Sequence, residues 1–351
     1  MANMFKNERG QPCPREPFSS NANLVKKHFK NLTNSSSFQQ LMKKLLFTFL
    51  LACATVHARA QNLSAQYASY GQLILVKLDS APFPHPGRAQ GHTYQREFYS
   101  AEKNYSDNSV AIFVPNGFRP TARVDFVVHF HGWRHHVENT LSEYQLIDQF
   151  AAAGRNAILV VPQGPYDAPD SFGGKLEDPG GFQRFMSDVM KTLHQRGVIA
   201  AGTLGTIILS GHSGGYHVMS GIVARGGISE HIREVWLFDA LYGQRELFWD
   251  WFAKYPGGRM IDIYTQHGGT KEESENFMKW CKEQQPPVPF VSKNEMDVED
   301  LDLRQSHLIF IYSGLEHNEV VYKQHQFTRY LKTSCLAPLK KYSSPKAAGN
   351  D

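Results

Sequence analysis

The chain has 351 residues, of which 41% are hydrophobic and 20% are charged, and this balance excludes a largely disordered chain, a collagen and a coiled coil. Four cysteines are too few for a disulfide-dense scaffold. The net charge of +4 comes from the first 60 residues, which hold nine Lys and Arg and two Asp and Glu; the rest carries 28 basic and 31 acidic residues, so no nucleic-acid partner is predicted.

Residues 42–60 contain the three parts of a secretory signal. Met42 is followed by two lysines, by an apolar run over residues 45–56, and by the small-residue pattern Ala58-Arg59-Ala60. The run is too short to span a bilayer as a helix. We therefore expect cleavage after Ala60, a secreted or periplasmic product, and no stable membrane insertion of the mature protein.

Residues 1–41 are polar and rich in Asn, Ser and Lys, which is unusual ahead of an export signal. We interpret them as an extension upstream of a true start at Met42. The alternative is a genuine N-terminal region that makes residues 45–56 an internal hydrophobic element. Lipidation of Cys53 is a further alternative, disfavoured by the large Leu51 where lipid-attachment signals carry a small residue.

The remaining chain alternates strand-like and helix-like segments. Apolar runs predict strands at residues 73–78, 109–115, 124–131, 156–162, 206–210, 234–238, 260–264 and 307–312. Helical spacing of apolar residues predicts helices at residues 138–154, 182–197, 216–224, 246–255, 271–284 and 319–333. Apolar strands separated by helices indicate a mostly parallel sheet of about eight strands with helices on both faces, an α/β fold.

We predict a single domain over residues 61–335, with an excursion between strands at residues 286–305 and a disordered tail at residues 336–351. Once the leader is removed, the only cysteines left are Cys281 and Cys335. Disulfides persist in exported proteins, but two cysteines also fit two buried apolar side chains. The sequence leaves their pairing open, and it leaves the oligomeric state open as well.

A nucleophile motif stands between a predicted strand and a predicted helix. Residues 211–215 read GHSGG, which is the pattern G-x-S-x-G. The serine of this pattern sits on a sharp strand-to-helix turn, and the glycines around it let the backbones pass closely. The turn places the Ser213 hydroxyl in a cleft at the carboxyl end of the sheet. Helix N–H groups lie next to it and favour a negative charge.

With this motif and this order of elements, residues 70–335 resemble the α/β-hydrolase superfamily. Within it, the chain resembles secreted esterases of the feruloyl-esterase and polyester-depolymerase kind. The resemblance implies an α/β-hydrolase fold and a serine hydrolase that needs neither a cofactor nor a metal. It also implies an oxyanion hole made by the backbone N–H groups of Trp133, which follows the third strand, and of Gly214, which follows the nucleophile. His131, Gly132 and His212 flank these donors and are expected to contact the substrate.

The resemblance further implies a general base and an acid. His317 follows the last predicted strand, where the family carries its base. Asp239 ends the strand after the nucleophile helix, and the order Ser213, Asp239, His317 matches the family's order. Most members place the acid after the following strand, where this chain has only Glu272 and Glu273 a few residues on. We predict Asp239, because a carboxylate that ends an apolar strand is costly to bury without a partner.

A cluster of histidines offers a rival mechanism. His129, His131, His135 and His136 lie within eight residues of one another. His129 and His131 share one face of a strand and could bind zinc with a third histidine. A zinc site explains neither the nucleophile motif nor His317, so we predict no metal. The alternative interpretation packs His131 beneath the oxyanion loop and places His135 and His136 at the mouth of the cleft.

Residues 163–181 form a loop rich in Gly and Pro at the predicted active-site edge of the sheet. Loops at this edge often bind ligands, so Asp170 and Ser171 are candidate substrate contacts, although a plain surface loop is equally compatible. The predicted function is hydrolysis of a small-molecule or polymer-linked carboxylic ester through an acyl-enzyme. A serine peptidase or amidase on the same fold, and a binding protein on an inactive hydrolase scaffold, are the alternatives.

Overall fold

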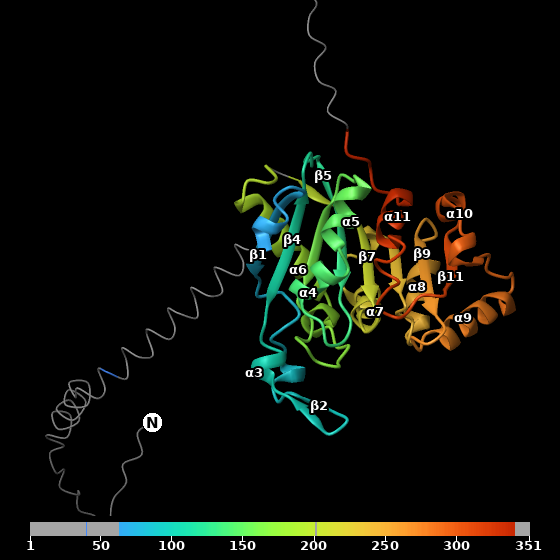
Figure 1. Cartoon of the computed structure of the whole chain (residues 1–351), viewed down its shortest axis with the longest axis horizontal. Coiled ribbons are helices and arrows are strands. Elements are labelled where there is room, and N and C mark those ends of the chain that lie inside the picture. Colours follow the sequence, from blue (N-terminus) through green and yellow to red (C-terminus); the bar gives the residue numbers. More distant parts are fainter. Residues whose placement is uncertain (1–39, 41–62, 201, 341–351) are drawn as a thin grey trace, which may run out of the picture. The chain divides into compact units, whose positions relative to one another are not determined.

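The computed structural model describes Gln40 and residues 63–200 and 202–340 (Figure 1). The predicted signal at residues 42–60, nearly all of the upstream extension, and residues 341–351 of the predicted tail lie outside the described residues, so export and the disorder of residues 341–351 stay predictions. Residues 336–340 differ from the predicted disordered tail, because the Ala337 carbonyl accepts the Asn156 N–H and the Leu339 N–H donates to the Gly154 carbonyl, both at 2.8 Å. Among the helices of the described part, none is both long enough and apolar enough to cross a membrane.

A nine-stranded sheet forms the centre of the fold, in the order β1-β4-β6-β5-β7-β8-β9-β11-β10. Strand β4 runs antiparallel to both of its neighbours, and all other neighbouring pairs are parallel. The strands are β1 (Gly71–Lys77), β4 (Ser109–Pro115), β5 (Arg123–Phe130), β6 (Ile158–Pro162), β7 (Thr203–His212), β8 (Ile232–Phe238), β9 (Arg259–Thr265), β10 (Val291–Asn294) and β11 (Leu308–Ser313).

The helices follow the strands in alternation. The α-helices are α3 (Ala101–Asn104), α4 (Val137–Glu143), α5 (Leu146–Ala153), α6 (Gly181–Gln195), α7 (Gly215–Arg225), α8 (Arg245–Lys254), α9 (Lys271–Glu283), α10 (Asp300–Gln305) and α11 (Gln326–Thr333). Short 3-10 helices are η1 (Pro86–Arg88), η2 (Gly174–Glu177), η3 (Ser229–His231) and η4 (Glu295–Asp297).

Side chains that alternate along the strands pack into two separate cores, one on each face of the sheet. Ile207 and Leu209 of β7 pack with α6, α7, α8 and α9, whereas Ile208 between them packs with α4, α5 and α11. All three side chains are fully buried. This arrangement confirms the predicted α/β-hydrolase fold, with nine strands in the sheet instead of about eight.

The structure corrects several predicted elements. The single helix expected at residues 138–154 is two helices, because Gln145 takes a left-handed conformation with φ of 49° between them. The helix expected at residues 319–333 begins only at Gln326, and turns precede it. The excursion at residues 286–305 contains β10 and α10. Cys281 and Cys335 are both free, the first buried and the second exposed.

A small antiparallel hairpin, β2 (His92–Tyr94) and β3 (Glu97–Tyr99), was not predicted. Figure 1 shows β2 and α3 at the lower edge of the view, beyond the body of the main sheet. Tyr94 of the hairpin packs edge-on against Trp133, with 5.1 Å between ring centroids. The hairpin therefore borders the loop that follows β5.

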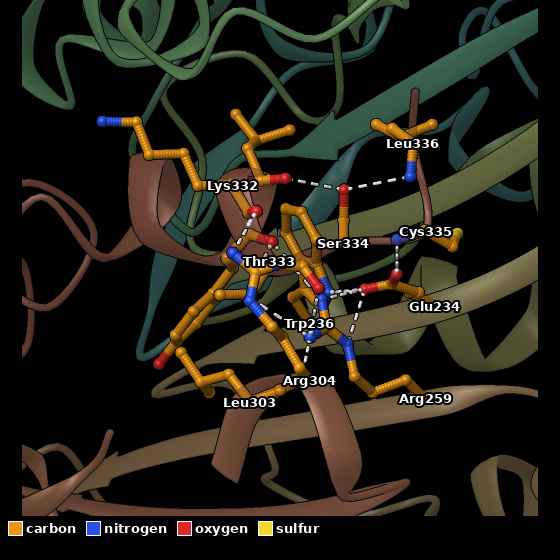
Figure 2. Close-up of polar contacts among 12 residues, drawn as sticks. Glu234, Trp236, Arg259, Leu303, Arg304, Lys332, Thr333, Ser334, Cys335 and Leu336 are labelled. Carbon is orange, nitrogen blue, oxygen red and sulfur yellow. Dashed lines mark hydrogen bonds and ion pairs between the residues drawn. The ribbon is translucent and has the colours of Figure 1, made fainter. Parts of the chain in front are cut away.

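A buried ion pair fastens the C-terminal segment to the sheet (Figure 2). Arg259 Nε lies 2.8 Å from Glu234 Oε2, and its Nη1 donates to the Thr333 carbonyl at 3.1 Å. Glu234 also accepts hydrogen bonds from the Trp236 indole at 2.9 Å and from the Cys335 N–H at 2.8 Å. Both charges are nearly fully buried, so each depends on the other and on these hydrogen bonds.

Chain order reverses direction beside β5, since β6 lies on one side of β5 and β7 on the other. In open α/β sheets, ligands bind at the carboxyl ends of the strands at such a switch point. Trp133 follows β5 and Ser213 follows β7, so both predicted elements of the active site lie at this edge.

Candidate active site

The turn at Ser213, the predicted nucleophile turn, has the strained backbone that its sequence predicts. Ser213 has φ of 53°, in the left-handed region that an ordinary residue rarely adopts. Its N–H donates to the Phe238 carbonyl at 3.1 Å, which ties the turn to the end of β8. A Cβ on Gly215 would come within 2.7 Å of the Phe130 carbonyl oxygen, so only glycine lets α7 begin so close to β5.

Asp239 and His317 lie together although 78 positions separate them in sequence. His317 Nδ1 is 2.7 Å from Asp239 Oδ2. The Thr265 hydroxyl donates to the same oxygen at 2.7 Å, and the Thr265 N–H donates to Oδ1 at 3.1 Å. Thr270 adds a hydrogen bond from its hydroxyl to Oδ1. An ionised carboxylate can only accept hydrogen bonds, and here it has four donors around it. His317 Nδ1 must therefore carry the hydrogen of its contact with Asp239, which fixes the tautomer of His317.

The electrostatics keep Asp239 ionised. Its side chain is fully buried, and burial alone would raise its pKa. The hydrogen bonds from His317, Thr270 and Thr265 outweigh burial and lower the pKa of Asp239 below its usual value. A permanent negative charge next to His317 stabilises an imidazolium at that position.

No hydrogen bond joins Ser213 and His317 within the described structure, although the loops that carry them are in contact. His212, directly before Ser213, lies 2.9 Å from the His317 carbonyl through its Nε2. The Ser213 hydroxyl interacts with the phenol of Tyr242, whose ring centroid is 6.4 Å from that of His317. Catalytic hydrogen bonds are often long without a substrate and tighten when one binds.

Two backbone N–H groups near Ser213 have no acceptor among the described residues, those of Trp133 and Gly214. A Cβ on Gly132 would come within 2.7 Å of the Ser213 Cβ, so glycine is needed for the loop after β5 to approach Ser213. Gly214 is the residue that precedes α7, at the positive end of the helix dipole. Both groups are therefore free to donate to an oxygen that develops negative charge beside Ser213.

The Trp133 side chain covers one side of the turn. Its indole Nε1 donates to the Ser171 hydroxyl at 2.7 Å, and both groups lie against Gly214. Tyr242, which follows β8, stands on the other side of β7. Trp133 is 39% exposed and Tyr242 is 36% exposed, so two aromatic surfaces flank a partly open Ser213.

Two predicted substrate contacts have other partners in the structure. Asp170 is buried and its carboxylate is held by Arg88, at 2.6 Å to Nε and 3.1 Å to Nη2. The Phe172 N–H donates to the same carboxylate at 3.0 Å. His131 is buried, its Nδ1 donates to the Gly132 carbonyl at 2.8 Å, and its Nε2 accepts the Gly164 N–H at 2.9 Å. The side-chain polar atoms of both residues are thus engaged with neighbouring loops in this structure, and a substrate contact by either residue stays a prediction.

The four clustered histidines do not converge on one point. Apart from His131, their partners are Ser210 for His129, Glu143 for His135, and Asp167 for His136. Burial lowers the pKa of His131 to about 4 and that of His129 to about 3, so both are neutral. Within the described residues, no group of three or more His, Cys, Asp or Glu side chains is placed to hold a metal ion.

Sequence reasoning missed several residues of the site. Tyr242 stands three positions after Asp239 in a segment without a recognisable pattern. Thr265 and Thr270 match no motif in the sequence. Tyr144 lies within the helix predicted at residues 138–154 and its ring is buried, yet its hydroxyl contacts His135 and His212. Only the absence of a carboxylate after β9 pointed indirectly to Thr265.

No protein-family model matches this sequence, and no curated protein matches it. Among solved structures, the chain is similar to a feruloyl esterase module from Clostridium thermocellum (11% identity, TM-score 0.48, 75% of this chain and 88% of that one covered). It is also similar to a fluorophosphonate-binding serine hydrolase of Staphylococcus aureus (11%, 0.42, 75% and 97%). A third similar structure is an esterase from the archaeon Pyrobaculum calidifontis (14%, 0.42, 85% and 98%).

Proposed function

We propose that the protein is a serine hydrolase that cleaves carboxylic esters through an acyl-enzyme intermediate. The observation that carries this proposal is the 2.7 Å contact between Asp239 and His317, on a loop that also contacts the nucleophile turn through His212. In acyl transfer, a buried ionised acid such as Asp239 orients a histidine, and the histidine then acts as general base for a serine on a strained turn.

The proposed reaction has two halves. Ser213 Oγ attacks the ester carbonyl carbon while His317 Nε2 takes the serine proton, and the N–H groups of Trp133 and Gly214 receive the oxyanion. When the tetrahedral intermediate collapses, the bond to the alcohol breaks and His317 gives its proton to the leaving oxygen. Water then attacks the acyl-serine with His317 as base, and the acid and free Ser213 are released. These steps use no cofactor.

The surroundings of Ser213 favour a large substrate. Trp133 and Tyr242 are exposed on its two sides, and the His317 side chain is 30% exposed. Flat aromatic surfaces at an open site suit an ester whose remaining parts extend along the protein surface. We therefore propose a polymer-linked or bulky ester in preference to a small ester enclosed in a pocket.

Labelling with a fluorophosphonate probe tests the proposed nucleophile. The wild-type protein should be labelled on Ser213, and Ser213→Ala should lose both the label and turnover of aryl esters by several orders of magnitude while it stays folded. Ser187→Ala, at an exposed serine of α6, is the matched control and should behave as wild type. Labelling that persists in Ser213→Ala would reject the assignment, and preferred turnover of aminoacyl anilides would favour a peptidase.

A further inference from the structure

A buried chain of hydrogen bonds runs between the two loops of the proposed active site. His135 Nδ1 lies 3.0 Å from the Trp133 carbonyl, and His135 Nε2 lies 3.2 Å from the Tyr144 hydroxyl. The Tyr144 hydroxyl lies 2.9 Å from His212 Nδ1, and His212 Nε2 lies 2.9 Å from the His317 carbonyl. The three linking side chains, His135, Tyr144 and His212, are all buried.

The direction of each hydrogen follows from the two ends of the chain. A carbonyl only accepts, so His212 Nε2 and His135 Nδ1 must each carry a hydrogen. Burial lowers the pKa of His212 well below its usual value, and its neutral ring therefore leaves Nδ1 bare to accept the Tyr144 hydroxyl hydrogen.

The other contact of the Tyr144 hydroxyl is with His135 Nε2, which also lies 3.1 Å from Glu143 Oε2. The Tyr144 hydroxyl therefore lies between two histidines, one of which contacts the Trp133 carbonyl and the other the His317 carbonyl.

The chain joins two parts of the backbone that the sheet does not hold together. Trp133 follows β5 and His317 follows β11, and three other strands separate these two in the sheet. Rigid rings fill the distance, with centroid separations of 5.1 Å for Tyr144 and His212 and 4.5 Å for His212 and His317. A shift of either loop would break a hydrogen bond inside a low-dielectric core, where an unpaired polar group is costly.

We propose that Tyr144 is a positioning residue that holds the oxyanion donor at Trp133 and the base at His317 in register across the nucleophile turn. This inference rests on the proposed function, because the two groups that Tyr144 positions have their roles only in that reaction. Tyr144 touches no reacting atom. It acts through the two peptide units at the ends of the chain, so its effect should fall on the transition state and spare substrate binding.

Tyr144→Phe tests the proposal because it keeps the buried ring and removes only the hydroxyl. We expect kcat to fall roughly tenfold, the equivalent of one lost hydrogen bond, with KM changed less than about twofold. Tyr330→Phe is the matched control. Tyr330 is equally buried in the same core, and its hydroxyl has no hydrogen-bond partner in the described structure. This control should leave kcat unchanged.

Amide hydrogen exchange gives a readout that does not depend on the reaction. Exchange at residues 132–136 and 314–318 should become faster in Tyr144→Phe and stay unchanged in Tyr330→Phe. If Tyr144→Phe does not fold, His135→Gln interrupts the chain nearer the surface and should have the same two effects. In a double variant the kcat losses should not add, because either change breaks the same chain.

The outcomes separate the two proposals. Wild-type protein without labelling or turnover would reject the proposed function, and the exchange data would still decide whether the chain holds the loops. Active wild-type protein with unchanged kcat or unchanged exchange in Tyr144→Phe would overturn the positioning role. An equal loss in Tyr330→Phe would overturn it too, since the effect would then be one of general core packing.

Discussion

Asp239 Oδ2 lies 2.7 Å from His317 Nδ1, and Thr265 at the end of the next strand donates two hydrogen bonds to the same carboxylate. The resemblance noted in the sequence places the acid after that next strand in most members. Here the position at the end of β9 carries a threonine, whose hydroxyl and N–H support a carboxylate at the end of β8. In this chain the carboxylate that contacts His317 therefore stands at the end of β8, and the residue at the end of β9 supports it.

Asp239→Asn should lower turnover by up to about 10⁴ with little change in fold. An amide presents a nitrogen where the carboxylate accepts from Thr265, Thr270 and His317, so the His317 ring loses its fixed tautomer. Steady-state kinetics on an aryl ester measures the loss.

Glu272→Gln and Glu273→Gln are the matched controls for that experiment. Both residues stand in the first turn of α9, and neither forms a hydrogen bond or ion pair with His317 in the described structure. Each change should cost less than about twofold in turnover. A large loss in either control with an active Asp239→Asn would place the acid after β9 instead.

Trp133→Ala should separate the side chain of Trp133 from its backbone donor. The N–H stays, but the indole contacts with Ser171 and Tyr94 are lost. We expect KM for a bulky ester to rise about five- to tenfold and kcat to change much less, because binding area is lost and the proposed oxyanion donor remains. Phe98→Ala is the control. It removes an exposed aromatic ring from the β2–β3 hairpin that also carries Tyr94, and it should leave KM and kcat unchanged. A fall in kcat alone would show that the indole acts in the transition state.

Asp262 should make the stability of the protein fall with rising pH. Burial raises the pKa of this β9 carboxyl to about 7, although Ser274 donates a hydrogen bond to it at 2.6 Å. Between about pH 4 and pH 7 the folded state therefore holds a proton that the unfolded state has lost. The contribution to stability is full below pH 4 and declines by up to about 1.4 kcal/mol per pH unit up to pH 7.

Asp262→Asn removes this titration. Denaturant unfolding at pH 5 and pH 8 should show the variant gaining on the wild type as pH rises, by about 2–3 kcal/mol between the two conditions. Asp250→Asn, at an exposed position of α8, should leave the pH dependence as it is in the wild type. Parallel pH profiles for wild type and Asp262→Asn would contradict a buried neutral Asp262.

Arg259→Met should destabilise the fold by about 3–5 kcal/mol, because it leaves the Glu234 charge buried without its partner. Urea unfolding measures the loss, and adding Glu234→Gln should recover much of it. Lys271→Met breaks an exposed pair with Glu275, at 3.4 Å, and should cost less than about 0.5 kcal/mol. A loss in Arg259→Met as small as in this control would show that water reaches Glu234.

Local sequence patterns predicted much of the fold. Apolar runs predicted β1 and the strands from β4 to β11 except β10. Burial on both faces demands such runs in the central strands. Short polar pieces were missed. Each strand of the β2–β3 hairpin has only three residues, too few to form a recognisable run. Gln145 interrupts a helical pattern with a left-handed φ that its residue type does not predict.

The sequence by itself determined the place of the turn at Ser213. A sharp turn from a strand into a helix requires small residues on both sides, and this local steric requirement is met by the glycines around Ser213. The sequence also determined the chain order of Ser213, Asp239 and His317. Which carboxylate meets His317 was decided by the tertiary structure, as were the binding of Asp170 to Arg88 and the contacts of Tyr144 and Tyr242 near the turn. These contacts join residues that are far apart along the chain, so no local period encodes them, and only the packing of loops from separate strands brings their atoms within reach.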